Sequence, residues 1–160
     1  MQIRPSIVDV RRAGPEDAAV VLTMVREIAA SEDDASDAAG TAESWAAMLA
    51  RPDVVVLLAE RDGVPVGYLS AVRMLHLWLG RDILALDDLF VRDGYRGARV
   101  GRLLMHALAR LATAEDPLVR WEVDERNVDA QRFCLRLGAS LRTEVIAAWT
   151  PEAQRAALRE

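Results

Sequence analysis

The spacing of apolar residues divides the first third of the chain into a short strand and two helices. Residues 6–10 alternate apolar and polar side chains, which is typical of a half-buried strand. Residues 14–30 carry apolar side chains three and four positions apart, and Pro15 stands at the first helical position. A second helical pattern begins after Thr41, whose hydroxyl is a good N-terminal cap. The acidic stretch 31–40 interrupts the apolar pattern and predicts a loop.

The middle of the chain predicts a β-sheet followed by one long helix. Residues 54–60 and 64–75 are strand-like, and the hairpin turn signal Arg61-Asp62-Gly63 joins them. Residues 82–91 predict a third strand. An apolar stripe then predicts a helix that ends at Asp116-Pro117, because the residue before a proline disfavours helical backbone. The stripe consists of Val100, Leu103, Leu104, Ala107, Leu108 and Leu111.

The last third continues with strands and helices in turn. Residues 118–123 and 139–149 predict strands, and the helix between them is capped by Asn127 and closed by Gly138. A terminal helix follows Thr150. The order β-α-α-β-β-β-α-β-α-β, followed by that helix, predicts a mixed α/β fold. At 160 residues, with no repeat or linker, the chain is expected to form a single domain over 1–160.

Composition and charge argue against several classes of protein. The net charge of −5 is opposite to the broad basic surface that a nucleic-acid partner requires. One cysteine and two histidines cannot supply a disulfide framework or a histidine-rich metal site, so we expect no metal. No apolar run approaches the roughly 18 residues of a membrane span. The first residues also lack the pattern of an export signal. We therefore expect a cytoplasmic protein with no membrane or nucleic-acid partner.

Positive charge is nonetheless concentrated between residues 92 and 102, where four arginines and three glycines lead into the predicted helix. A helix N-terminus favours negative charge, because its first N–H groups are unpaired and the helix dipole is positive there. Arg96, Arg99 and Arg102 add planar donors that match phosphate oxygens. The alternative is a solvated arginine cluster beside a turn. A P-loop and a G-x-G-x-x-G motif are both absent from the sequence.

Two segments resemble motifs of the GNAT superfamily of N-acetyltransferases. The frame Arg96-Gly97-Ala98-Arg99-Val100-Gly101 is similar to the Q/R-x-x-G-x-G/A acetyl-CoA loop, and LDDLFVRDGYRG before it is similar to the family's fourth strand and turn. The segment NVDAQRFCLRLGA, residues 127–139, resembles N-x-x-A-x-x-F-Y-x-x-L-G-F. The resemblance follows the element order over 6–150. It implies the GNAT fold, a central mixed, mostly antiparallel sheet flanked by helices, with a splayed cleft for acetyl-CoA.

The resemblance implies that acetyl-CoA is the cosubstrate. The pyrophosphate would lie at the glycine loop, main-chain groups of Leu89 and Val91 would pair with the pantetheine arm, and Asn127 would add a coenzyme contact. Arg99 departs from the motif because it stands at the first glycine, and we expect it to weaken or shift binding slightly. The implied coenzyme contacts are Leu89, Phe90, Val91, Arg96, Gly97, Ala98, Arg99, Val100, Gly101, Arg102, Asn127 and Phe133.

The resemblance also implies direct transfer of the acetyl group to an amine. An alkyl amine has a pKa near 10.4 and must lose a proton before it attacks. The sequence LDDLFV is similar to the L-E-D-L/F-x-V of polyamine acetyltransferases, which makes Asp87 the expected base. Strand alternation would place Asp87 and Asp88 on opposite faces. The alternative is that the acidic pair marks a strand near solvent or pairs with an arginine.

Two further catalytic groups follow from the resemblance. A backbone N–H at Val91 or Leu89 is the expected donor to the developing oxyanion. Cys134 stands where the family has tyrosine, so it is a candidate acid for the leaving thiolate. Cys134 also belongs to an apolar stripe at helical spacing, and the alternative is a core residue with no chemical role.

The acceptor is expected to be a primary amine of a small molecule, polyamine- or aminoglycoside-like, or of a peptide. The acids between residues 32 and 37 border the acceptor site in the resembled fold and would attract such a cation, unless they form a solvated loop. Two rival functions stay open: a non-catalytic acyl-CoA-binding or regulatory module of the same fold, and an unrelated nucleotide-binding domain. The apolar segment EVIAAW, residues 144–149, predicts a homodimer.

Overall fold

The computed structural model describes residues 7–31, 40–97, 99–114 and 117–159. These residues divide into two compact units, one ending at Glu122 and one beginning at Val123. The first unit contains a five-stranded sheet and its covering helices. The second contains two short helices. No helix among the described residues is long and apolar enough to cross a membrane.

The sheet of the first unit has its strands in chain order, and neighbours from the first to the fourth pair in antiparallel fashion. The fifth strand is parallel to the fourth, with Ile83 opposite Leu118. The mixed, mostly antiparallel sheet predicted from the sequence is confirmed. The strands are β1 Val8–Arg12, β2 Val54–Arg61, β3 Val64–His76, β4 Arg81–Val91 and β5 Leu118–Arg120.

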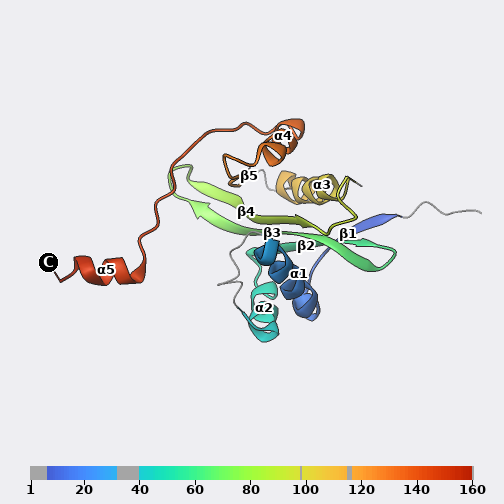
Figure 1. Cartoon of the computed structure of the whole chain (residues 1–160), viewed down its shortest axis with the longest axis horizontal. Helices are drawn as coiled ribbons and strands as arrows, with labels where there is room; N and C mark the ends of the chain where they lie inside the picture. The colour runs from blue at the N-terminus through green and yellow to red at the C-terminus, as the bar shows by residue number, and fades with distance from the viewer. Residues whose placement is uncertain (1–6, 32–39, 98, 115–116, 160) are drawn as a thin grey trace, which may run out of the picture. The chain divides into compact units, whose positions relative to one another are not determined.

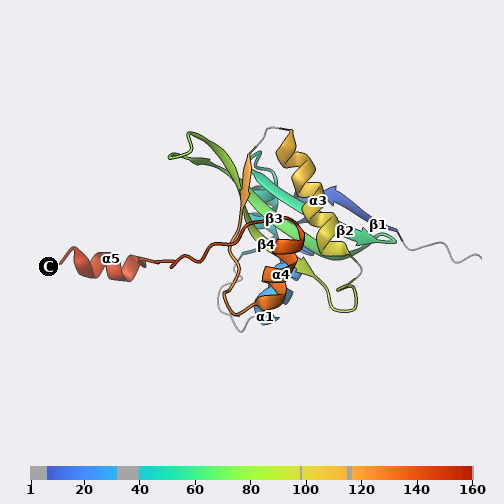
Figure 2. The same ribbon diagram turned by 90° about the horizontal axis from the view of Figure 1, so that it is seen from above.

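Helices cover both faces of this sheet (Figure 1). The short η1 (Pro15–Asp17), α1 (Ala18–Ser31) and α2 (Ala42–Leu49) lie on one face, where Tyr68 and Phe90 join their apolar residues in a core. The helix α3 (Val100–Thr113) lies across the strands on the other face (Figure 2). Alternation along β3 accounts for the two layers, because Gly67 faces α3 and Tyr68 faces the opposite core.

The predicted apolar face of α3 is correct in its centre and wrong at its end. Val100, Leu104 and Leu108 are at most 1% exposed. Leu111, predicted to continue this face, is 40% exposed, and Ala112 is buried in its place. Each residue turns the helix by 100°, so residues four positions apart stay close to the same face. Ala112, four positions after Leu108, therefore lies on the buried face, and Leu111 lies at its edge. The predicted stop at Asp116 lies outside the described residues.

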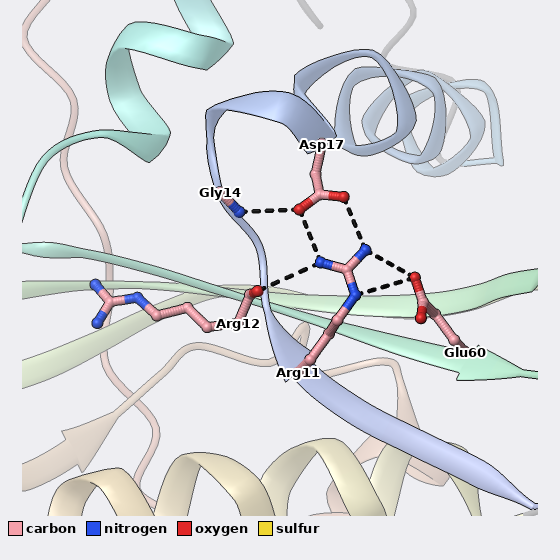
Figure 3. A network of polar contacts seen from close by, with 5 residues as sticks. All are labelled: Arg11, Arg12, Gly14, Asp17 and Glu60. Carbon is pink, nitrogen blue, oxygen red and sulfur yellow. Dashed lines mark hydrogen bonds and ion pairs between the residues drawn. The ribbon is translucent and has the colours of Figure 1, made fainter. Parts of the chain in front are cut away.

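A charged network joins β1 to η1 and to β2 (Figure 3). The Arg11 guanidinium on β1 donates two hydrogen bonds of 2.8 Å to the carboxylate of Asp17 on η1. It also pairs with Glu60 on β2 at 2.8 Å. Asp17 is buried, and it accepts a further hydrogen bond from the Gly14 N–H. The network therefore joins β1, β2 and the entry to α1.

The second unit contains the helices α4 (Val128–Arg136) and α5 (Pro151–Ala157). Both begin at the predicted caps, with the side chains of Asn127 and Thr150 accepting hydrogen bonds from the first turn. The strand predicted over 139–149 is wrong, because these residues form no regular secondary structure. An isolated strand has no ladder partner, and this unit contains no other strand among its described residues. The strand predicted over 118–123 is also shortened to the three residues of β5.

Candidate active site

β4 contains one extra residue at Asp87. Ser70 on β3 lies opposite Asp88, whereas the next residue, Ala71, lies opposite Leu86. Asp87 is therefore the inserted residue of a β-bulge and has no partner in the ladder. Such bulges bend a strand and redirect a side chain, and they are frequent beside active sites.

The bulge changes the faces that simple alternation predicts. Opposed residues in an antiparallel pair share a face, and Ser70 and Ala71 point to opposite faces. Leu86 and Asp88 consequently lie on opposite faces, although they are two residues apart. The regular alternation assumed for Asp87 and Asp88 is therefore interrupted, because Asp88 does not continue the pattern set by the start of β4.

Asp88 is half-buried and held by two hydroxyl groups of β3. The Tyr68 hydroxyl donates a 2.9 Å hydrogen bond to Oδ2 of Asp88. The Asp88 N–H donates to Oγ of Ser70 at 3.2 Å. The first contact satisfies the half-buried carboxylate and the second satisfies the main-chain N–H, so together they fix the position of Asp88.

Asp87 differs from its neighbour in both environment and contacts. Its side chain is exposed, and no hydrogen bond from the described residues engages its carboxylate. Partial desolvation, followed by the negative charge of Asp88, raises the pKa of Asp87 above the usual aspartate value of 3.8. A carboxylate without a hydrogen-bonding partner and with raised basicity is suited to accept a proton.

The strand beyond the bulge reaches the loop through Leu89, Phe90 and Val91. The Phe90 side chain is 8% exposed and packs with Tyr68, their ring centroids 6.1 Å apart. Phe90 can therefore contact a ligand only through its main chain. Leu89 and Val91 are half-buried and pair with Leu69 and Gly67.

The loop after β4 turns through left-handed backbone at three described positions. Gly94 and Gly97 have φ of +85° and +82°, which favour glycine. Arg99 has φ 63° and ψ 9°, and forms the N-cap of α3 with no side-chain capping bond. Ala98 lies outside the described residues. An arginine in this conformation is unusual, which explains why the resembled motif has glycine there.

The four arginines of this region have different contacts. Arg92 is held within the protein, where it pairs with Glu27 of α1 at 2.8 Å and donates to the Pro65 carbonyl at 2.7 Å. Arg96 is exposed, and its Nε donates to the Val91 carbonyl at 3.2 Å. Arg102 lies beside His106, with 3.4 Å between their nitrogens. Arg96, Arg99 and Arg102 are therefore exposed, with Arg96 also paired to the exposed Asp93 at 3.3 Å, whereas Arg92 supports the loop.

The start of α3 fits a phosphate group. The N–H groups of the first turn have no partner within the helix, and no acidic side chain lies in that turn. Val100 faces the core, half-buried Gly101 follows it, and exposed Arg102 completes the turn. Backbone donors, the helix dipole and three arginines thus stand at one helix end.

Gly67 is a structural requirement that our sequence analysis missed. A Cβ at this position would lie 2.6 Å from the Phe90 carbonyl oxygen and 3.4 Å from Cγ1 of Val100. Glycine here lets β3, β4 and the start of α3 approach closely. A glycine inside a strand pattern indicates such an approach, so VPVGYL contained the signal.

The second unit holds the remaining predicted site residues. Oδ1 of Asn127 accepts a 3.0 Å hydrogen bond from the Ala130 N–H, which confirms Asn127 as a helix cap. Phe133 is half-buried. Cys134 is 2% exposed, as its interpretation as a core residue expects.

Comparisons with known proteins identify the family of the chain. The model of the Acetyltransferase (GNAT) family matches residues 22–139. Aminoalkylphosphonate N-acetyltransferase from Salmonella typhimurium (strain LT2) is 31% identical over 135 residues, which cover 82% of this chain and 84% of that protein. The chain therefore belongs to the acetyltransferase (GNAT) family. The predicted class of enzyme, an acetyl-CoA-dependent N-acetyltransferase, is confirmed.

Solved structures show the same fold. An aminoglycoside acetyltransferase from an uncultured soil metagenomic sample, in complex with sisomicin, matches with a TM-score of 0.77 and 16% identity. The match covers 89% of this chain and 95% of that one. An aminoglycoside N-acetyltransferase in complex with CoA matches with a TM-score of 0.77 and 18% identity, covering 94% and 99% of the two chains. The GNAT fold predicted from the sequence is thus confirmed.

Proposed function

We propose that this protein transfers an acetyl group from acetyl-CoA to the primary amine of a small molecule, with Asp87 as the base. The observation that carries the proposal is the bulge, which separates an exposed, unanchored Asp87 from an anchored Asp88. Bound acetyl-CoA supplies an activated acyl group. The Asp87 carboxylate accepts the proton of the amine, directly or through a water molecule.

The coenzyme site in this proposal extends from the bulge to the first turn of α3. Main-chain groups of Leu89 and Val91 pair with the pantetheine arm, and one of their N–H groups is the oxyanion donor. The helix N-terminus holds the pyrophosphate. The further contacts are Phe90 through its main chain, the side chains of Arg96, Arg99 and Arg102, the loop residues Gly97, Ala98, Val100 and Gly101, and Asn127 and Phe133.

Cys134 has a packing role in this proposal. Its side chain is 2% exposed, so the thiol has little access to a ligand. The leaving thiolate then departs without an acid from this residue. Replacement of Cys134 by serine tests this assignment, since it should affect stability rather than the pH dependence of turnover.

The acceptor is a small molecule that carries a primary amine. The relative from Salmonella typhimurium is named for aminoalkylphosphonates, and the similar structures include aminoglycoside acetyltransferases. These names share an amine acceptor and differ in the rest of the molecule. The acidic stretch at 32–37, which we expected to attract a cation, lies outside the described residues.

We further propose that residues 1–160 act as one N-acetyltransferase domain of a cytoplasmic homodimer. The family match supports a single domain because it runs from residue 22 to residue 139, across the boundary between the two units. Exposed apolar residues on the segment 144–149, with Val145 at 98%, support self-association.

The test of Asp87 is thiol release from acetyl-CoA with a panel of amines, comparing wild type with Asp87→Asn. We expect kcat to fall by a factor of about 10² or more, because general base catalysis contributes on that scale. Stabilisation by acetyl-CoA in thermal unfolding should stay as in wild type, since the coenzyme contacts are unchanged. Asp82→Asn, which removes an exposed carboxylate from the start of β4, is the matched control and should turn over normally.

The pH profile gives a second test of the same residue. Because the pKa of Asp87 is raised, the acidic limb of kcat/KM should lie at higher pH than an ordinary aspartate with a pKa of 3.8 would give. Asp87→Asn should remove that limb. Equal turnover of Asp87→Asn and wild type would reject Asp87 as the base.

The alternative of a non-catalytic acyl-CoA-binding module is motivated by Arg99 in the glycine loop. It predicts stabilisation by acetyl-CoA without saturable thiol release for any amine. Saturable release rejects it.

A further inference from the structure

We propose that Tyr68 and Ser70 are positioning residues for catalysis, because their hydroxyls fix Asp88 and so determine that Asp87 is the extra residue of the bulge. This inference rests on the proposed function of Asp87. It concerns two residues of β3 that are separate from the motifs described above and would not touch the substrate.

The sequence of β4 leaves open which aspartate is in the ladder. Asp87 and Asp88 are chemically identical neighbours, and a bulge displaced by one residue would place Asp87 opposite Ser70. Because strand residues alternate between faces, that displacement would exchange the environments of the two carboxylates. Contacts that distinguish Asp88 from Asp87 are therefore needed to select the observed register.

Ser70 provides the first of these contacts. A bulge interrupts the backbone ladder, and the N–H of Asp88 donates instead to the Ser70 hydroxyl at 3.2 Å. Ser70 is one of two buried polar or charged residues among those described, at 9% exposure. Removal of its hydroxyl would leave this N–H without its partner, which disfavours the observed bulge.

Tyr68 provides the second contact, from the same face of β3. Its ring is fully buried and packs with Phe90, so the position of its hydroxyl is fixed. Tyr68 lies opposite Phe90, two register positions from the Ser70–Asp88 pair, and its hydroxyl reaches Asp88 Oδ2 diagonally at 2.9 Å. A buried phenol requires a hydrogen-bond partner, and Asp88 is the acceptor in this register.

The two hydroxyls together hold Asp88 by its main chain and by its side chain. Asp87 is then the residue left outside the ladder, with its carboxylate exposed and without a hydrogen-bond partner among the described residues. Loss of either hydroxyl should make the position of Asp87 less definite. Errors of about 1 Å in the position of a catalytic group lower rates by up to about a hundredfold.

The experiment compares Tyr68→Phe and Ser70→Ala with wild type in steady-state thiol release. Tyr68→Phe removes one oxygen and retains the buried ring, and Ser70→Ala tests the second hydroxyl independently. We expect each to lower kcat by about ten- to a hundredfold, with KM for acetyl-CoA unchanged within about twofold. A lower kcat with an unchanged KM for acetyl-CoA indicates a positioning role, because general destabilisation would not affect kcat alone.

Ser44→Ala is the matched control, because it removes a hydroxyl that accepts a hydrogen bond from the Thr41 N–H at the start of α2. It should lower the midpoint of thermal unfolding through the lost helix cap and leave kcat unchanged. We expect both Ser44→Ala and Tyr68→Phe to lower the midpoint of thermal unfolding, with kcat lowered only in Tyr68→Phe.

Double variants with Asp87→Asn distinguish this inference from the proposed function. If the hydroxyls act through Asp87, Tyr68→Phe should lower kcat no further once Asp87 is replaced. Wild-type kcat in both Tyr68→Phe and Ser70→Ala, or a full additional loss in the double variant, would overturn the inference while Asp87 remained the base. Wild-type kcat in Asp87→Asn would overturn both.

Discussion

Arg99 occupies a backbone conformation that suits glycine, and it does so at the helix end where the coenzyme phosphates are proposed to bind. An L-residue with φ near +60° places Cβ close to the following carbonyl oxygen. The charge of Arg99 and the conformation of its backbone therefore act in opposite directions. The side chain contributes a donor to an anion, while the backbone is less stable than a glycine would be.

The substitution Arg99→Gly should raise the free energy of unfolding by about 1 kcal/mol, because it relieves the left-handed strain. Denaturant unfolding would measure the change. Arg102→Gly is the control at a regular helical position of α3, where glycine should be destabilising by about 1 kcal/mol. Lower stability of Arg99→Gly than of wild type would contradict this interpretation of the loop.

Asp17 should make stability depend on pH. The Arg11 guanidinium lowers the pKa of Asp17 below its usual value of 3.8. A depressed folded-state pKa contributes stability above the unfolded-state pKa, and that contribution is lost as pH falls through the folded-state value. Asp17→Asn should therefore lower the unfolding free energy by about 1–3 kcal/mol at pH 7, and by less below pH of about 4.

Denaturant midpoints measured between pH 7 and pH 3 would test this contribution. Asp53→Asn is the control, because the Arg51–Asp53 pair is exposed to solvent and should contribute much less. A difference between Asp17→Asn and wild type that persisted unchanged at pH 3 would show that the carboxylate charge is not the cause.

At the scale of elements, the junction of β4 with its loop depends on contacts with α1 and β3. The Arg92 N–H donates to the Val66 carbonyl at 2.9 Å, while its side chain pairs with Glu27. Gly67, next to Val66, admits the close approach of α3. The proposed coenzyme loop is thus supported by residues distant in the sequence.

Glu27→Gln tests this support. Loss of the charge on α1 should loosen the start of the loop and raise KM for acetyl-CoA several-fold, with kcat nearly unchanged. Steady-state kinetics with acetyl-CoA as the varied substrate would measure both constants. Glu16→Gln, the same change on η1, is expected to behave as wild type, and an unchanged KM in Glu27→Gln would exclude a role of α1 in the coenzyme loop.

At the scale of the whole molecule, the strongly exposed apolar side chains include two neighbouring pairs. Leu77 and Trp78, between β3 and β4, are 84% and 94% exposed. Val145 and Ile146 in the second unit are 98% and 69% exposed. Clusters of this kind mark interaction surfaces, and they are consistent with the proposed homodimer.

Val145→Lys should therefore shift the protein from dimer to monomer, because a charge at a buried apolar contact is costly. Size-exclusion chromatography with light scattering would measure the mass over a range of concentrations. Val64→Lys, at an exposed strand start, is the control and should keep the wild-type mass. A wild-type protein that is monomeric at all concentrations would reject the homodimer.

The elements of the first unit could be predicted because their signals are local. The three central strands and the core of α3 follow from periods of two and 3.6 residues, and turn glycines separate them. The conformation of the loop proposed to bind the coenzyme could also be expected, since its glycines, its arginines and the helix that follows are contiguous in the chain. The same local signals failed for 139–149, where a strand-like pattern has no neighbouring strand within its unit.

The sequence alone therefore determined the family, the order of elements in the first unit and the segment proposed to bind the coenzyme. Only the tertiary structure decided which aspartate is anchored, because the register of β3 against β4 and the hydroxyls of Tyr68 and Ser70 come from another strand. The tertiary structure likewise pairs Arg92 with Glu27, which is 65 residues away in the sequence. Periodicity follows from the geometry of one chain segment, whereas strand register and side-chain pairing depend on which segments meet in the fold.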